Sequence, residues 1–265
     1  MAKPKVGILV KRPLREMILS GEDLEKLRAF AEVKINPEDR DLTEEEAAEF
    51  LRGMDGAMSS WQVSNLTPAI LETAPALKIW AYGAGTIKGK ICDEAWEKGV
   101  IVTSAAPAIA DDVAELTMGF ITIGLRKVIS YMRQMRANER TVKDESRSLY
   151  RRTVGVISAS QVGQRVMRLL RHYEVRTLLY DPFMDAARAR EEFGAELVDL
   201  ETMARESDVV TCHAPKLPAT YHMWNATHFK LMKDDAVFVN TSRGDNLDEQ
   251  ALVEELKKGR FFAFL

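Results

Sequence analysis

Short apolar runs alternate with segments of helical periodicity along this sequence, and no other feature constrains its fold as strongly. Runs of this kind suit strands buried on both faces, and regular strand–helix alternation indicates parallel sheets covered by helices on both sides. In the N-terminal part, Thr43 and Glu46 form the pattern of a capping box at the start of a helix. Strands are expected there at 5–10, 32–35, 56–59, 78–82 and 100–103, and further helices at 22–30, 68–73 and 93–98.

A second series of the same kind follows a long helical segment. That segment runs from Asp111 to about Met135, and its apolar residues cover most of its circumference, which predicts a helix buried between domains or between subunits. A polar stretch at 138–152 separates it from the second series. Strands are expected at 153–157, 176–180, 209–212, 236–239 and 260–265, with helices at 162–172, 184–192 and near 251–258. We therefore predict two doubly wound α/β domains, residues 1–103 and 104–265, joined by the long helix.

Composition excludes several classes of protein. Thirty-seven basic and forty acidic residues give a net charge of −3, which favours neither nucleic-acid binding nor membrane-surface binding. Cys92 and Cys212 lie far apart without a metal-like spacing, as in reduced cytoplasmic proteins. The N-terminus lacks a signal-sequence pattern, and the longest apolar tract, 113–125, is too short to span a bilayer. We expect a soluble cytoplasmic protein without a metal ion.

A turn between the strand at 153–157 and the following helix has the spacing of a phosphate-binding loop. It reads Ser158-Ala159-Ser160-Gln161-Val162-Gly163, which is G-x-G-x-x-G with serine at the first two glycine positions. The N-terminus of the following helix offers free N–H groups to a pyrophosphate. A Cβ at a position that requires a positive φ should cost about 1 kcal/mol. The context predicts dinucleotide binding despite the two serines.

Asp181 supports this interpretation by its position. It stands eighteen residues after Gly163, at the end of the next predicted strand. A carboxylate there can accept both ribose hydroxyls of NAD and repels the 2′-phosphate of NADP. The alternative is that Asp181 only begins the turn made by Pro182.

A third signal is the pentapeptide Asn240-Thr241-Ser242-Arg243-Gly244, which follows the apolar run at 236–239. An arginine at the carboxyl end of a buried strand lies where open α/β sheets place their ligands. Its guanidinium presents a planar fork of donors that suits a carboxylate or a carbonyl oxygen. Arg243 is therefore the leading candidate for a catalytic residue.

With these parts in order, the chain resembles the D-isomer-specific 2-hydroxyacid dehydrogenases, which include phosphoglycerate dehydrogenases and glyoxylate reductases. The likeness covers residues 50–265 and, more loosely, the first fifty. It rests on Gly83-Ala84-Gly85-Thr86, Asp112-Val113-Ala114-Glu115-Leu116-Thr117, residues 153–163, Tyr180-Asp181-Pro182, Ser207-Asp208-Val209-Val210, His213-Ala214-Pro215, Leu231-Met232-Lys233 and residues 239–244. The resemblance implies a flavodoxin-like substrate domain and a Rossmann NAD-binding domain that is incomplete at its C-terminal end. It also implies a homodimer formed through the long helix.

The resemblance assigns roles to individual residues. The N–H groups of Gly83, Ala84, Gly85 and Thr86 would hold the carboxylate of a small 2-keto acid, and Arg243 would bind and polarise its carbonyl. Trp61 would either contact the substrate or pack between the domains. NAD contacts are implied for Ser160, Gln161, Val162, Gly163, Asp181, His213, Ala214, Pro215, Thr220, Thr241, Ser242 and Arg243.

The departures from the family pattern define an alternative. In the family, a glutamate orients a histidine that donates the proton, and the matching positions lie beyond Leu265. His213 occupies a position that the family uses structurally. His172 ends a helix expected to face away from the cleft, and His222 and His228 lie in or before a helical segment expected to be exposed. Two hypotheses follow: an NAD-dependent dehydrogenase of 2-hydroxy acids, or a non-catalytic NAD(H)-binding sensor or interaction module with the same fold.

Overall fold

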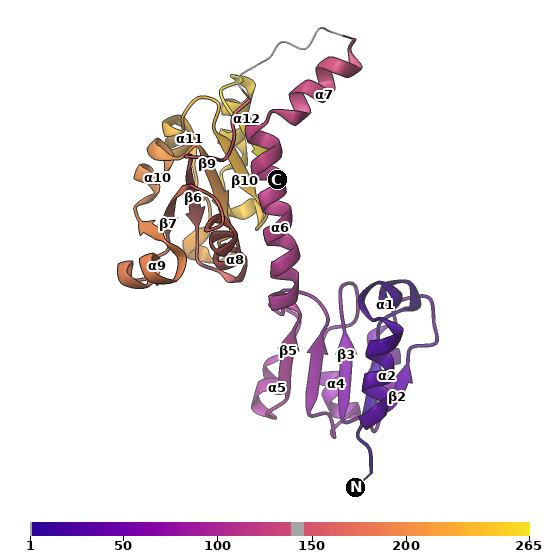
Figure 1. Cartoon of the computed structure of the whole chain (residues 1–265). Helices are drawn as coiled ribbons and strands as arrows, with labels where there is room; N and C mark the ends of the chain where they lie inside the picture. The colour runs from indigo at the N-terminus through magenta and orange to yellow at the C-terminus, as the bar shows by residue number, and fades with distance from the viewer. Residues whose placement is uncertain (1, 139–145) are drawn as a thin grey trace. The chain divides into compact units, whose positions relative to one another are not determined.

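The computed structural model describes residues 2–138 and 146–265, so part of the polar stretch predicted at 138–152 lies outside the described residues. The chain divides into two compact units, Met1–Ile109 and Ala110–Leu265 (Figure 1). The sequence placed the boundary between residues 103 and 104, whereas these units meet between Ile109 and Ala110.

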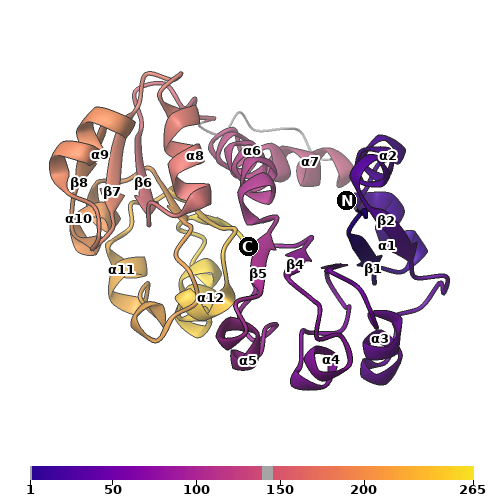
Figure 2. The same cartoon turned by 90° about the horizontal axis from the view of Figure 1, so that it is seen from below.

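The first unit is a parallel sheet of five strands in the order β2-β1-β3-β4-β5. This is the order of the flavodoxin-like fold that the sequence predicts. The strands are β1 (Lys5–Ile8), β2 (Glu32–Ile35), β3 (Gly56–Ser59), β4 (Ile79–Tyr82) and β5 (Ile101–Ser104). Helix α2 lies on one face of the sheet, and α3, α4 and α5 lie on the other (Figure 2). The helices are α1 (Arg12–Ile18), α2 (Gly21–Phe30), α3 (Glu44–Phe50), α4 (Pro68–Thr73) and α5 (Asp93–Glu97).

Local chemistry explains where these helices begin. The capping box expected at α3 is confirmed, because Thr43 Oγ1 accepts from the Glu46 N–H at 3.2 Å and the Glu46 carboxylate accepts from the Thr43 N–H at 2.9 Å. Ser20 and Asp23 form a second capping box at α2. Helix α1 was not predicted; it starts at Arg12, and Pro13 lies in its first turn, where proline is tolerated.

The second unit is a parallel sheet of six strands in the order β11-β10-β9-β6-β7-β8. Counted within the unit, this is the 3-2-1-4-5-6 order of the Rossmann fold. The strands are β6 (Thr153–Ile157), β7 (Arg176–Tyr180), β8 (Ala195–Leu197), β9 (Val209–Cys212), β10 (Val237–Asn240) and β11 (Phe262–Phe264). The strand β8 was not predicted, because its sequence Ala-Glu-Leu is short and carries no apolar run.

Helices cover both faces of this sheet, as parallel strands buried on both sides require. One core joins α6, α8 and α9 to side chains such as Val237 and Val239, and the other joins α10, α11 and α12 to Phe238. Alternate residues of β10 thus enter opposite cores. These helices are α6 (Ala106–Leu125), α8 (Gln161–Leu170), α9 (Ala186–Phe193), α10 (Leu200–Glu206), α11 (Ala226–Leu231) and α12 (Glu249–Lys257). In the described residues, no helix is long and apolar enough to cross a membrane.

The single long helix predicted from Asp111 to about Met135 is wrong. The structure has two helices there, α6 and α7 (Val128–Arg136), because Lys127 adopts a left-handed φ of 52° and interrupts the hydrogen-bonded ladder. The side chain of Lys127 is buried, and its ammonium group lies 3.2 Å from the carboxylate of Asp235. No residue of α7 is buried within the chain, so the expected burial of this part between domains or between subunits stays a prediction.

A buried carboxylate fixes the end of α12. Glu255 has only 3% of its side chain exposed and pairs with Lys258 at 2.6 Å and with Arg260 at 3.1 Å. The hydrogen bond from Lys258, followed by that from Arg260, holds the pKa of Glu255 below its usual range. Arg260 also donates to the Met232 carbonyl at 2.7 Å, so it joins α11, α12 and β11.

We expect Arg260→Leu to lower the free energy of unfolding by about 2 kcal/mol, because charged hydrogen bonds to a buried carboxylate are lost. Urea denaturation measures the change. The control is Arg205→Leu, which removes an exposed pair with Glu201 and should change stability little. Equal effects of the two substitutions would contradict the assignment. Because the pKa of Glu255 is lowered in the folded state, its contribution is present above the glutamate pKa of the unfolded chain and is lost as pH falls further.

Candidate functional site

Four strand ends of the second unit lie side by side at one edge of the sheet. Tyr180, Ile157, Cys212 and Asn240 are successive partners across β7, β6, β9 and β10. The chain leaves β6 toward β7 on one side and later returns to β9 on the other, so the ends of β6 and β9 form a topological switch point, where such folds bind ligands. Each predicted cofactor segment of this unit starts directly after one of these four residues.

The turn after β6 accommodates its two serines in different ways. Ser158 adopts a left-handed φ of 75°, so the position does require the conformation that glycine adopts freely. Ser160 has an ordinary φ of −62° and caps α8, because its hydroxyl accepts from the Gly163 N–H at 3.4 Å. A serine therefore strains the first position and suits the second.

Only glycine fits the third position of this turn. A Cβ on Gly163 would lie 2.0 Å from the carbonyl oxygen of Ser158, which is far inside van der Waals contact. The close approach of these two backbone segments brings the turn over the N-terminus of α8. The first-turn N–H groups at Gln161 and Val162 are thus available to an anion.

Asp181 is tied to the same turn. Its Oδ2 accepts from the Ala159 N–H at 2.7 Å and from the Ser158 hydroxyl at 3.4 Å, and its Oδ1 accepts from the Phe183 N–H at 2.9 Å. The last bond is the turn predicted as the alternative role of Asp181, and it coexists with the contact to the phosphate turn. The carboxylate is half-buried, and one lone pair of Oδ1 is left to accept a ligand hydroxyl.

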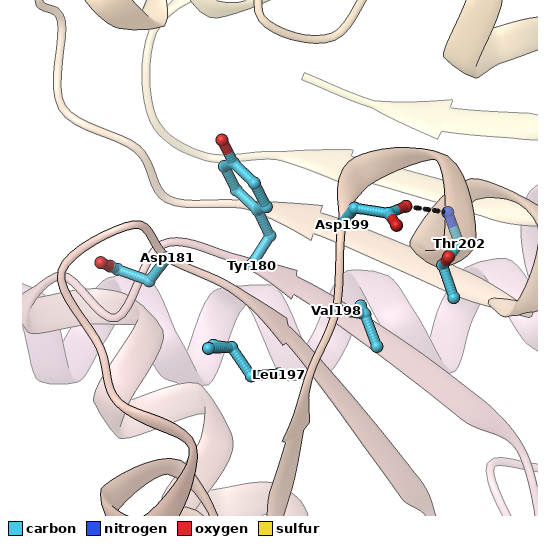
Figure 3. Close-up of a pocket in the computed structure, with 6 residues that line it drawn as sticks. All are labelled: Tyr180, Asp181, Leu197, Val198, Asp199 and Thr202. Atoms are coloured by element: carbon cyan, nitrogen blue, oxygen red, sulfur yellow. Dashed lines mark hydrogen bonds between the residues drawn. The ribbon is translucent and has the colours of Figure 1, made fainter.

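A cavity of about 540 Å³ adjoins Asp181. Figure 3 shows Tyr180 and Asp181 beside Leu197 and Val198, with Asp199 and Thr202 at the start of α10. Its volume is in the range of small-molecule sites, with aliphatic walls and carboxylates at the edge. The residues of β8 and α10 that line this cavity were not predicted as site residues, because neither element was predicted from the sequence. Asp199 caps α10 at 2.6 Å from the Thr202 N–H, and this bond lowers the pKa of Asp199.

The turn that carries Arg243 is shaped by Asn240. Its amide donates to the Arg243 carbonyl at 2.9 Å, and its carbonyl accepts from the N–H and hydroxyl of Ser242 at 3.0 and 2.6 Å. The Arg243 guanidinium donates only to the Ser242 carbonyl, at 2.7 Å, among the contacts of the described residues. It is exposed and borders a cavity of about 510 Å³ whose other walls include Val113, Leu116 and Phe120 of α6.

His213 is the centre of a buried polar chain. Thr117 donates to the Val113 carbonyl at 2.7 Å and lies 3.2 Å from the Thr241 hydroxyl. Thr241 in turn lies 3.3 Å from Nδ1 of His213, and Thr211 lies 2.9 Å from Nε2. Since the proton of Thr117 is used, Thr241 donates to Thr117, and Nδ1–H donates to Thr241. Nε2 then accepts from Thr211.

His213 is neutral because its imidazole is buried. Burial lowers the pKa of His213 to about 3. Both ring nitrogens are already bonded, so His213 has a structural role at the site. Of the other predicted cofactor residues, Thr220 donates to the Pro215 carbonyl at 2.6 Å and closes the loop after β9. Its contact with a cofactor stays a prediction, as do those of Ala214 and Pro215.

The predicted substrate residues lie at the carboxyl edge of the first unit. The Gly83 N–H donates to the Ser59 carbonyl at 2.7 Å, so this group is not available to a ligand. From the sequence, we expected it to hold the substrate carboxylate. The N–H groups of Ala84, Gly85 and Thr86 donate no hydrogen bond among the described residues, so they remain available to a ligand. Trp61 follows β3, and 46% of it is exposed in the chain. In the described residues, no cluster of side chains has the composition of a metal site.

Comparison with known proteins places this geometry in a family. Residues 118–265 match the family model described as "D-isomer specific 2-hydroxyacid dehydrogenase, NAD binding domain". The chain is 32% identical over 260 residues to D-3-phosphoglycerate dehydrogenase of Methanocaldococcus jannaschii, covering 97% of this chain and 48% of that protein. It is 30% identical over 265 residues to glyoxylate reductase of Thermococcus gammatolerans, covering 97% of this chain and 77% of that protein.

A solved structure agrees. The apo-structure of D-lactate dehydrogenase from Escherichia coli superposes with a TM-score of 0.70 at 27% identity, covering 97% of this chain and 80% of that one. Several curated relatives are matched over only 48–60% of their own length, so this chain spans about half of those proteins.

The two serines of the phosphate turn should respond oppositely to the same substitution. Ser158→Gly should raise the free energy of unfolding by about 0.5 kcal/mol, because the release of left-handed strain exceeds the entropy cost of glycine. Ser160→Gly should lower it by a few tenths of a kcal/mol, because the cap is lost. Chemical denaturation of the two variants checks the sign. A loss of stability in both would contradict the strain at Ser158.

Proposed function

The chain belongs to the D-isomer specific 2-hydroxyacid dehydrogenase family, and from this premise we propose that it is an NAD-dependent oxidoreductase that interconverts a small 2-hydroxy acid and its 2-keto acid. The observation that carries the proposal is the position of Arg243, at the end of β10 and on the same sheet edge as the phosphate turn. The geometry of the site and the similarity to known dehydrogenases support this activity.

The second unit has the features that an NAD site needs. Gly163 permits the close turn over the N-terminus of α8, and that terminus offers N–H groups to the pyrophosphate. Asp181 stands where the adenosine ribose would lie, beside the cavity at the ends of β7 and β8. Its negative charge disfavours a 2′-phosphate, so we propose NAD in preference to NADP.

Arg243 supplies the electrostatic part of the proposed reaction. When bound, NADH supplies the hydride. The guanidinium of Arg243 would hold the substrate carbonyl and stabilise the negative charge that develops on its oxygen, because most of its donors are uncommitted. Asn240 fixes the backbone at Ser242 and Arg243 and so holds the guanidinium-bearing residue in place. The N–H groups at residues 84–86 would hold the substrate carboxylate, by resemblance to the family.

Proton transfer separates the two candidate functions. The nascent alkoxide needs an acid, and His213 is unsuited because its pKa is about 3 and both nitrogens are bonded. The locked state of His213 is the observation that favours a second candidate, an NAD(H)-binding sensor or interaction module that holds cofactor and keto acid without rapid turnover.

Binding and turnover measurements on the 265-residue chain test these proposals. We expect NADH to bind, with NADPH weaker, and oxamate, an unreactive analogue of a 2-keto acid, to bind the NADH complex. Arg243→Lys should weaken oxamate binding by about 100-fold, since the planar fork is lost, and leave NADH affinity nearly unchanged. Oxidation of NADH with glyoxylate, pyruvate or hydroxypyruvate would identify the dehydrogenase. Tight binding without turnover would identify the sensor, and no binding of NADH would exclude both.

We also propose that the chain forms a homodimer through α7 and the adjoining part of α6. Helix α7 buries no residue within the chain, and its exposed apolar residues include Ile129, Met132 and Met135. Leu116 of α6 is also half exposed. Exposed apolar residues of this kind are typical of protein–protein contacts.

Sedimentation velocity tests the dimer. Met132→Glu should shift the chain from dimer to monomer, because a charge would be buried without a partner in the contact. Met17→Glu is the matched control, since Met17 is 82% exposed and lies in the first unit. A monomeric wild type, or equal sedimentation of both variants, would refute the proposal.

A further inference from the structure

We propose that Asn246 is a positioning residue that locks the Arg243 turn to the loop at 213–215. The proposal rests on the proposed NAD-dependent function, in which these two segments bind substrate and cofactor. Asn246 lies in the short 3₁₀ turn Gly244–Asn246, three residues after Arg243, and nothing in the sequence pattern marks it as functional. Its side chain is nevertheless fully buried.

The contacts of the Asn246 amide join the ends of two strands. Its Nδ2 donates to the Ala214 carbonyl at 2.6 Å, beyond β9, and to the Ser242 hydroxyl at 3.1 Å, beyond β10. Ser242 can accept this bond because its own proton goes to Asn240. One NH₂ group therefore holds the residue before Arg243 and the middle of the predicted cofactor loop.

The orientation of the amide is fixed by these bonds. Oδ1 of Asn246 is buried and has no hydrogen-bond partner among the described residues. Exchange of the oxygen and nitrogen would place a carbonyl oxygen against the Ala214 oxygen and leave the nitrogen without an acceptor. A buried polar side chain that leaves one of its two groups unsatisfied is costly. The cost indicates that the link made by Nδ2 is the reason for an asparagine here.

The backbone of this segment is held independently of the Asn246 side chain. His222 N–H donates to the Asp245 carbonyl at 2.9 Å, Trp224 N–H to the Asn246 carbonyl at 3.2 Å, and Asp248 N–H to the Trp224 carbonyl at 2.9 Å. Lys216 also pairs with Asp245. Removal of the amide therefore leaves the segment in place and cuts only its connection to Ala214 and Ser242. A displacement of these two residues would change the positions of the groups that bind cofactor and substrate, and so weaken binding.

Asn246→Leu tests the link by removing both hydrogen bonds at similar volume. We expect the dissociation constant of NADH to rise about tenfold, because the Ala214 carbonyl is left unpaired and its loop shifts. Oxamate affinity for the NADH complex should fall as well, through Ser242. The matched control is Asn36→Leu, which removes a buried asparagine of the first unit that donates to the Leu9 and Arg40 carbonyls at 3.0 and 3.3 Å. This control should lose stability and keep NADH affinity.

Asn246→Asp adds a pH profile that general destabilisation would not produce. At low pH the introduced carboxyl is neutral and can donate to the Ala214 carbonyl, so NADH should bind almost as in the wild type. Burial raises its pKa, and ionisation at higher pH sets a negative oxygen against the carbonyl, so NADH affinity should fall as pH rises.

The neighbouring groups should not produce this profile. Cys212 stays protonated because burial raises its pKa, and His213 stays neutral because burial lowers its pKa to about 3. The nearby Lys216–Asp245 pair is present in the wild type as well, which should show no such profile.

The outcomes separate this inference from the function on which it rests. If the wild type binds NADH and Asn246→Leu binds it equally well, the positioning role is wrong and the proposed function stands. Equal loss of NADH affinity in Asn246→Leu and Asn36→Leu, or a pH-independent affinity in Asn246→Asp, also overturns the inference. If the wild type does not bind NADH, both the positioning role of Asn246 and the proposed function are wrong.

Discussion

The parallel register of four strands is the constraint on which the candidate site depends. Because Tyr180, Ile157, Cys212 and Asn240 are aligned across the sheet, the four segments that follow them emerge together. Residues separated by up to 83 positions in sequence, Ile157 to Asn240, are thereby brought to one edge. Hydrogen bonds of the ladder and burial on both faces fix that alignment, since a one-residue slip would turn every buried side chain to the wrong core.

Much of this arrangement could be predicted from sequence because it depends on local pattern. Apolar runs identified most strands, the Thr43 box marked the start of a helix, and ordered motifs identified the family. The elements that were missed have weak local signals. The strand β8 is three residues long, and Lys127, at the break, pairs with Asp235, 108 residues away. Periodicity alone could not show that a lysine would end a helix there.

The phosphate turn shows the same limit at the level of single residues. A pattern search treats the two serines as equal departures from glycine, whereas one lies in a left-handed conformation and the other caps a helix. The distinction depends on φ, which the residue type does not specify. Asn246 was missed for a related reason: its importance comes from the Ala214 carbonyl, which lies on another loop. Contacts of this kind become visible only once the strands are aligned.

The hydrogen-bond chain through His213 has a consequence for how protons can reach the site. Every proton in it points the same way, from Thr211 through the imidazole and Thr241 to Thr117, and the chain ends at the Val113 carbonyl. A peptide carbonyl does not pass a proton onward, so this row of side chains cannot conduct one from the protein interior. A ligand beside Arg243 therefore receives no proton along this row of side chains.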